Sequence, residues 1–179
     1  MKETLIIVDD KDNFIGYATR EECHSGKGIR HRAFVILLFN KDKKILLQKR
    51  KHKLWNNYWD LTAASHPLHL EGRDETYEEA AAKCLKREWD VSLKPAGLKN
   101  ILAFNYSERY SGSCENEHCA LMVGEYSGKL KPDSKACYEY KWIKLQDLIV
   151  LVKKDPENFT PWLLEAVKKL KNHPFAKQL

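Results

Sequence analysis

The chain contains no apolar run that approaches the ~20 residues needed for a membrane-spanning helix. It also lacks a CxxC pair, and its five cysteines are scattered and odd in number, which fits reduced thiols better than a disulfide framework. The start Met1-Lys-Glu is a poor match to an export signal. Together these absences argue against a membrane-spanning or disulfide-stapled secreted chain, and we expect a cytoplasmic protein with no membrane partner.

The excess of basic residues is modest. Lys and Arg number 31 against 25 Asp and Glu, which gives a formal net charge of +6. A basic balance suits nucleic acid and small phosphates equally well, but there is no RNP-like motif and no Arg-rich arm. We therefore interpret most of this charge as solvated surface and expect a small-molecule partner rather than a nucleic acid.

The pattern of apolar residues predicts an α+β fold. Residues 4–8 and 14–17 predict a β-hairpin, and 21–28 predict a glycine-bearing loop that includes His24. The runs 31–39 and 44–49 predict a buried antiparallel pair, and the period becomes helical from Thr76. Further strands are predicted at 100–106, 117–126 and 137–143, and a closing helix begins at Pro161. This order predicts a mixed or antiparallel sheet with helices on its faces.

Five side chains from separate segments form a candidate metal site. Glu115 and Glu117 are two residues apart, so on a strand they lie on the same face, where two carboxylates repel unless a cation lies between them. His24, His31 and His66 could add three imidazoles. Such nitrogen and oxygen ligands suit an octahedral Mn, Mg, Fe or Zn ion with one position left for substrate. Spacing alone is weak evidence for a site whose ligands are this dispersed.

Glu88 is a second candidate. In the predicted helix it is four residues from Cys84 and three from Leu85, so it points toward the apolar stripe or its margin. A charge in that place needs a partner.

Several motifs together resemble one family. They are His31-Arg-Ala-Phe, Leu46-Leu-Gln-Lys-Arg50, Ser65-His-Pro-Leu68, Glu88 late in the long helix, Glu115-Asn-Glu117 and Pro161-Trp162. With this combination the chain resembles the Nudix superfamily and, within it, the type I isopentenyl-diphosphate isomerases, from about His24 to Trp162. The resemblance implies a Nudix fold, an α/β/α sandwich. We expect one Nudix-type domain over 1–179, with an N-terminal hairpin and metal-ligand loop at 1–30, a core at 31–150 and a C-terminal helix at 151–179.

The resemblance also implies roles for individual residues. It implies that a divalent metal (Mn²⁺, Mg²⁺ or Zn²⁺) binds the three histidines and two glutamates, and that Glu88 helps to hold a Mg²⁺ that bridges to the substrate diphosphate. It implies that Arg50 and Lys53 bind diphosphate oxygens. Tyr106 matches a tyrosine paired with the catalytic glutamate, here Glu117, and Trp162 matches a tryptophan whose ring faces a carbocation.

Two departures from the family pattern bear on the reaction. The family's mechanism needs an acid and a base on opposite faces of the alkene, and the cysteine that supplies one of them is Ala64 here. An alanine methyl transfers no proton. Nudix hydrolases in turn have Arg-Glu-apolar-x-Glu-Glu on the helix, whereas this chain has Lys83-Cys-Leu-Lys-Arg-Glu88 and retains one glutamate of that set.

Three functions follow from these observations. The first, which we place ahead of the others because the specific match is to the isomerase subfamily, is an isomerase-type enzyme that protonates and deprotonates an isoprenoid diphosphate. The second is a Mg²⁺-dependent diphosphohydrolase without the cysteine, and the third is a non-catalytic diphosphate binder. The sequence leaves the metal, the oligomeric state and the group attached to the diphosphate open.

Overall fold

The computed structural model describes residues 3–179. Its strands are β1 (Thr4–Val8), β2 (Phe14–Thr19), β3 (His31–Phe39), β4 (Lys44–Arg50), β5 (Trp59–Asp60), β6 (Ala63–Ser65), β7 (His69–Leu70), β8 (Arg73–Asp74), β9 (Lys99–Tyr110), β10 (Ser113–Glu125) and β11 (Cys137–Lys144). Its α-helices are α1 (Arg20–Cys23), α2 (Tyr77–Trp89), α3 (Leu145–Lys154) and α4 (Pro161–Leu170). Short 3₁₀ turns occupy Pro95–Gly97, Pro156–Asn158 and Pro174–Gln178.

The sheet is organised around β3. One edge of β3 pairs in parallel with β10, which pairs on its other side with β9. The second edge of β3 is shared along its length by three strands, because β1 pairs at His31, β6 at 34–36 and β4 at Phe39. Beyond its pairing with Phe39, β4 diverges from β3 and pairs with β5 and β11 instead. Within residues 3–179, nine strands thus form one mixed sheet.

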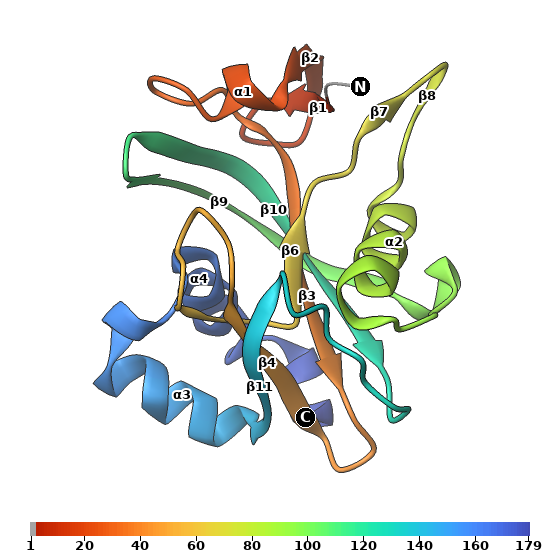
Figure 1. Cartoon of the computed structure of the whole chain (residues 1–179), viewed down its shortest axis with the longest axis vertical. Helices are drawn as coiled ribbons and strands as arrows, with labels where there is room; N and C mark the ends of the chain where they lie inside the picture. The colour runs from red at the N-terminus through yellow and green to blue at the C-terminus, as the bar shows by residue number, and fades with distance from the viewer. Residues whose placement is uncertain (1–2) are drawn as a thin grey trace.

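Apolar residues cover both faces of this sheet. On β3, Val35 and Leu37 face the side covered by α3 and α4, whereas Phe34 and Ile36 face the side covered by α2. Figure 1 shows the helices on the two sides of the strands. A nearly continuous apolar strand is typical of a strand that is buried on both faces. The predicted α+β fold with helices on both faces of a mixed sheet is confirmed.

The N-terminal hairpin of β1 and β2 is confirmed, but the predicted loop after it is partly wrong. Arg20–Cys23 forms the short helix α1, which begins with a capping box between Thr19 and Glu22. In a capping box the first side chain and the fourth satisfy each other's backbone N–H groups. His24 is the residue that ends this helix, and its backbone N–H donates to the Arg20 carbonyl, so the helix determines the position of the His24 backbone.

The C-terminal part has one more helix than the sequence pattern predicted. α4 begins at Pro161 as expected, but α3 precedes it and spans the predicted boundary at residue 150. The short strands from β5 to β8 were also missed, because two or three residues are too few to show a period.

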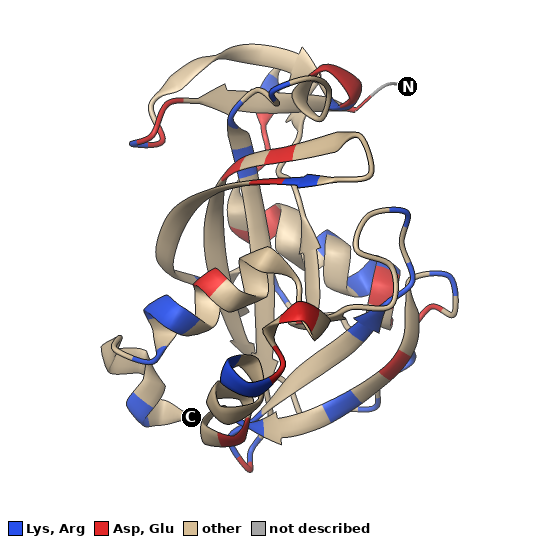
Figure 2. Cartoon of the chain, turned by 90° about the vertical axis from the view of Figure 1, so that its left-hand side faces the viewer, with Lys and Arg blue, Asp and Glu red and all other residues tan. Residues whose placement is uncertain are grey.

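Charged residues of both signs are interspersed along hairpins, strands and helices (Figure 2). Among the described residues, no helix is both long enough and apolar enough to cross a membrane.

The end of α2 offers a stability test. Asp90 terminates the helix in the left-handed conformation, with φ 53° and ψ 27°. This conformation costs a non-glycine residue roughly 1–2 kcal/mol, whereas the ion pair of Asp90 with Lys86 is exposed and therefore weak. We expect Asp90→Gly to raise the free energy of unfolding in urea by about 0.5–1 kcal/mol. Asp90→Ala is the control and should lower it; the opposite ranking would contradict the assignment of strain to this residue.

Candidate metal centre and cavity

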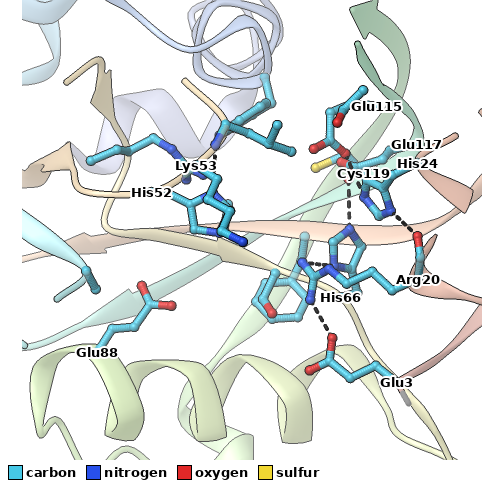
Figure 3. A pocket seen from close by; sticks show the side chains of 18 of the residues that line it. Glu3, Arg20, His24, His52, Lys53, His66, Glu88, Glu115, Glu117 and Cys119 are labelled. Carbon is cyan, nitrogen blue, oxygen red and sulfur yellow. Dashed lines mark hydrogen bonds and ion pairs between the residues drawn. The ribbon is translucent and has the colours of Figure 1, made fainter. Parts of the chain in front are cut away.

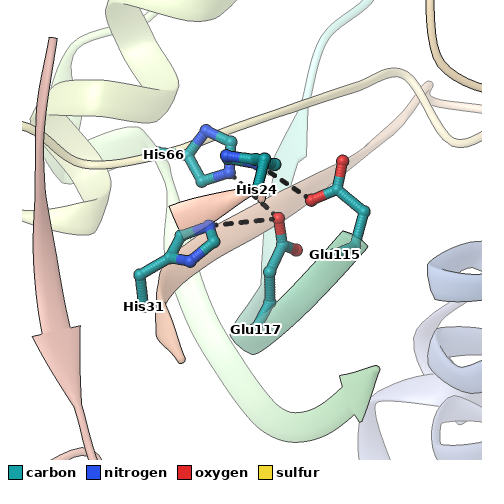
Figure 4. A group of neighbouring side chains, drawn as sticks. All are labelled: His24, His31, His66, Glu115 and Glu117. Carbon is teal, nitrogen blue, oxygen red and sulfur yellow. Dashed lines mark hydrogen bonds and ion pairs between the residues drawn. The ribbon is translucent and has the colours of Figure 1, made fainter. Parts of the chain in front are cut away.

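The five predicted ligands meet at one point. The side chains of His24, His31, His66, Glu115 and Glu117 each offer one ligand atom, and these atoms all lie within 4.8 Å of one another. Figure 4 shows the imidazoles and carboxylates pointing toward a common centre. A set of three nitrogen and two oxygen donors so close together could bind a divalent metal.

The sheet explains why they meet. Glu115 and Glu117 lie on the same face of β10, as their spacing predicted, and Glu117 is the direct partner of His31 on β3. His24 comes from the end of α1, which is held beside β10 because the Cys114 N–H donates to the His24 carbonyl at 3.0 Å. His66 follows directly after β6. Four separate segments therefore supply the site.

Distances and unpaired atoms fit a metal. His66 Nε2 is 2.9 Å from Glu117 Oε1, and His31 Nε2 is 3.7 Å from the same oxygen. Glu115 Oε2 lies 3.1 Å from His24 Nε2, but that contact lacks hydrogen-bond geometry. His31 Nε2 and Glu115 Oε2 are both buried with no hydrogen-bond partner. Buried polar atoms without partners are unfavourable, and a cation among these five side chains would satisfy both.

The acid–base properties of Glu117 and His66 suit ligation, whereas those of Glu115 reflect a repulsion between carboxylates that a bound cation would relieve. Burial and the neighbouring Glu117 carboxylate raise the pKa of Glu115. Burial alone would raise the pKa of Glu117, but His31 and hydrogen bonds outweigh it and lower that pKa. Burial, His31 and Arg20 hold the pKa of His66 well below its ordinary value, so its imidazole is neutral at neutral pH. A neutral imidazole and a carboxylate are the forms that bind metals.

The other ring nitrogens determine the orientation of the histidines. His24 Nδ1 lies 2.6 Å from the Arg20 carbonyl and His31 Nδ1 lies 2.7 Å from the Ile29 carbonyl, so both Nδ1 atoms donate and leave Nε2 free to bind. His66 differs, because the Arg20 guanidinium donates to its Nδ1 at 3.2 Å. Ligation through His66 Nε2 would place the proton on Nδ1, so Arg20 would have to move away. Arg20 was not predicted as a site residue, because its position one turn before His24 is informative only once α1 is known.

Glu117 has a further partner in Tyr106. The Tyr106 hydroxyl donates to Glu117 Oε2, and the two residues are directly paired between β9 and β10. Burial and the Glu117 carboxylate hold the pKa of Tyr106 well above its ordinary value, so the hydroxyl keeps its proton. The ring centroids of Tyr106 and Trp162 are 6.0 Å apart. Glu117, Tyr106 and Trp162 therefore lie together.

Glu117, Tyr106 and Trp162 line one large cavity of about 1040 Å³. The strands β6 and β4 both contribute to its wall, through Ala64 and Gln48. Basic side chains line other parts of it, including Lys53, Arg87 and Lys135. A cavity of roughly 300–1,000 Å³ is usual for small-molecule sites, so this one has room for an organic diphosphate.

Glu88 lies apart from the group of five ligands. In Figure 3 it is on the other side of the cavity from Glu115 and Glu117. Its carboxylate pairs with Arg87 at 2.9 Å, which supplies the partner that its position on the helix required. The role of Glu88 in holding a second metal stays a prediction.

The two predicted anion-binding residues differ in their surroundings. Lys53 is exposed at the rim of the cavity. Arg50 is largely buried and donates to Asp60 at 2.9 Å, and its guanidinium carbon lies 4.9 Å from the centroid of the Trp162 ring. No sequence pattern links Arg50 to this carboxylate partner, because Asp60 lies on another strand.

Ala64 lines the same cavity as Glu117, Tyr106 and Trp162. It pairs with Val35 of β3, so its methyl lies on the sheet face that holds these three residues, whereas the adjacent Ala63 packs into the core under α2. Cys119 also lines the cavity, but burial and Glu117 hold the pKa of its thiol well above the ordinary value. Ala64, which the isomerase resemblance matches to a cysteine, thus faces the site and offers no titratable group.

Comparison with known proteins identifies the family. The model of the NUDIX domain matches residues 29–163. The chain belongs to the NUDIX family.

The NUDIX relatives include two kinds of enzyme. The chain is 32% identical over 168 residues to isopentenyl-diphosphate Delta-isomerase 2 of Aromatoleum aromaticum, an alignment that covers 91% of this chain and 84% of the relative. It is 30% identical over 168 residues to prenyl-diphosphate phosphatase of Methanosarcina mazei, with 91% and 92% covered. A crystal structure from Deinococcus radiodurans superposes with a TM-score of 0.72 at 17% identity, covering 93% of this chain and 98% of that one, which supports the fold.

The pH dependence of metal binding is the first test of this site. Burial lowers the pKa of His24, but the Glu115 carboxylate more than compensates, so the pKa lies above its ordinary value. The protonated, non-binding form of His24 therefore persists to higher pH, and metal affinity should rise as pH increases through that range. Calorimetric titration with Mn²⁺ should show up to about tenfold weaker binding per pH unit on the acid side. His24→Gln should make the metal affinity less dependent on pH. A wild-type affinity that does not change between about pH 6 and 8 would contradict this prediction.

Proposed function

We propose that this chain is a divalent-metal-dependent enzyme that acts on isoprenoid diphosphates, and that its principal reaction is hydrolysis of the diphosphate. Both kinds of relative described above have names that refer to isopentenyl or prenyl diphosphates. The cavity supports such a substrate because it combines a metal-binding group, basic side chains and an apolar wall.

The two ends of the substrate would contact different walls. Lys53, Arg87 and Lys135 offer positive charge for the diphosphate, and Arg20 would join them once it leaves His66. The prenyl chain would lie against Leu54 and Trp162.

Ala64 is the observation that favours hydrolysis over isomerisation. Moving a double bond requires that one carbon gains a proton and another loses one, so two proton-transfer groups must face the substrate. Glu117 with Tyr106 provides one of them, and the position expected to provide the other is a methyl group.

Hydrolysis makes smaller demands on the side chains. A water oxygen attacks the terminal phosphorus, the bond from that phosphorus to the bridging oxygen breaks, and inorganic phosphate and a prenyl monophosphate result. Glu117, with its lowered pKa, is in the carboxylate form needed to accept the water's proton, and Tyr106 orients that carboxylate. A bound divalent metal would neutralise phosphate charge and make the water more acidic.

Isomerisation is the second candidate. Glu117, Tyr106 and Trp162 lie together as the isomerase resemblance implies, and relatives from Aromatoleum, Haloarcula and Serratia are named isomerases. Against it, the Arg50 guanidinium already lies near the Trp162 ring, so a resident cation uses part of the attraction that the ring would offer a carbocation.

Phosphate release separates these functions from simple binding. The metal-loaded protein should release inorganic phosphate from a prenyl diphosphate, and EDTA should abolish the release. ADP-ribose, a nucleoside diphosphate compound without a prenyl chain, is the control substrate and should react at least tenfold more slowly. Tight binding of the prenyl diphosphate without phosphate release or double-bond migration would favour the non-catalytic binder.

A further inference from the structure

Asp60 is a buried carboxylate outside the metal-binding group. It is the second residue of β5 and has no solvent exposure. Burial raises its pKa, whereas Arg50 and the hydrogen bonds from Trp162 and Thr160 oppose that rise. A carboxylate is rarely buried unless it is paired and hydrogen-bonded, and here two of its partners, Arg50 and Trp162, line the cavity.

The two oxygens of Asp60 join three segments. Oδ1 accepts from the Leu61 N–H at 2.8 Å, the Thr160 hydroxyl at 3.0 Å and Trp162 Nε1 at 2.8 Å. Oδ2 accepts from Arg50 at 2.9 Å and from the same Trp162 nitrogen at 2.9 Å. Because the Arg50 guanidinium also lies near the Trp162 ring, the three side chains form a closed triangle.

Backbone contacts support the same arrangement. The Thr160 N–H donates to the Trp59 carbonyl at 3.0 Å, and Trp59 forms an isolated bridge with Phe159. The start of α4 is therefore held against β5, and the hydrogen bonds that Trp162 donates to Asp60 fix the tryptophan ring within that junction.

Arg50 and Trp162 both line the cavity, whereas Asp60 does not. Arg50 Nε is buried and has no hydrogen-bond partner, so an acceptor from a ligand would satisfy it. A phosphate oxygen is such an acceptor. The Trp162 ring faces the region of Ala64, Tyr106 and Glu117.

We propose that Asp60 is a positioning residue that holds Arg50 for the diphosphate and Trp162 for the prenyl chain of one bound substrate. It acts through these two side chains and does not touch the substrate. The inference rests on the proposed function for the prenyl end, but the anion end can be tested without turnover.

The test is a double-mutant cycle read by affinity for magnesium pyrophosphate, using Asp60→Asn, Arg50→Gln and the double variant. Each single change should weaken binding by about 10- to 100-fold, because Arg50→Gln removes a charged donor to the phosphate and Asp60→Asn removes the carboxylate that holds this donor in place. The double variant should bind no more weakly than Arg50→Gln alone, because Asp60 affects the anion only through Arg50. Fold losses that multiply, or wild-type affinity in a folded Asp60→Asn protein, would overturn the proposal.

Trp162→Phe tests the other arm and retains every charge. The change removes the donor to Asp60 and keeps an aromatic ring, so kcat on a prenyl diphosphate should fall about tenfold while pyrophosphate affinity stays within twofold of wild type. If the Asp60→Asn protein fails to fold, the Trp162→Phe protein is the remaining test of the proposal. An unchanged kcat in the Trp162→Phe protein would overturn the proposal.

The matched control is Asp12→Asn, which breaks the ion pair of Asp12 with Arg32 at 2.7 Å, a pair whose members do not line the cavity. It should leave both readouts unchanged. If the wild-type protein turns over no prenyl diphosphate, the proposed function fails, yet the pyrophosphate cycle still decides whether Asp60 positions Arg50.

Discussion

Ala64→Cys should give the protein isopentenyl diphosphate isomerase turnover at least about 10²-fold above that of the unchanged chain. A positioned proton-transfer group contributes roughly 10²–10⁴-fold to such a reaction. The new thiol would replace a partly buried methyl that already lines the cavity, so it would enter the site shared with Glu117 and Tyr106 rather than the core. Formation of dimethylallyl diphosphate, followed by proton NMR, measures the gain.

The matched control is Ala63→Cys. Ala63 is the neighbour on β6, but it is fully buried in the core under α2, so a thiol there faces away from the site. It should produce no isomerisation. If the Ala64→Cys protein is folded and metal-loaded yet also forms no dimethylallyl diphosphate, the cavity is built for a substrate that the isomerase mechanism does not fit.

Glu117→Gln should have the second large effect. This carboxylate is one of the five candidate ligands, accepts from Tyr106 and His66, and is the proposed base. Its loss should lower phosphate release by about 10³-fold, within the range of a lost acid–base group. Metal affinity, measured by calorimetry with Mn²⁺, should fall by at least tenfold in the same protein.

Glu108→Gln is the control for that variant. Glu108 lies on β9 directly opposite Glu115 but is exposed, so the substitution removes the same charge from the same hairpin at a side chain that neither lines the cavity nor belongs to the five candidate ligands. It should leave both quantities unchanged. A Glu117→Gln protein that retains wild-type metal affinity and turnover would contradict both proposed roles of Glu117, as a metal ligand and as the base.

The sequence predicted the long elements well and the short ones poorly. The apolar run of β3 and the helical stripe of α2 are long enough to show their period, and both are confirmed. The helix α1 has four residues and β5 has two, so neither shows a period at all. Yet α1 determines where His24 lies, and β5 holds Asp60.

The metal-binding group could be predicted only in part. The spacing of Glu115 and Glu117 places both on one face of a strand, which follows from the geometry of a strand alone. That His24 and His66 reach the same point depends on tertiary packing, and only the family resemblance indicated it before the structure. Arg50 shows the reverse case, because its partner Asp60 is ten residues away on another strand and no local pattern links them.

One measurement tests the central claim directly. Isopentenyl diphosphate is incubated in D₂O with the Mn²⁺-loaded protein, the metal is removed before recording, and ¹H and ³¹P spectra are taken from the same sample. We predict that inorganic phosphate appears while the carbon-bound protons show neither deuterium incorporation nor double-bond migration. Deuterium incorporation or dimethylallyl diphosphate without phosphate release would contradict the account and would mean that a second proton-transfer group works in place of the missing cysteine at Ala64.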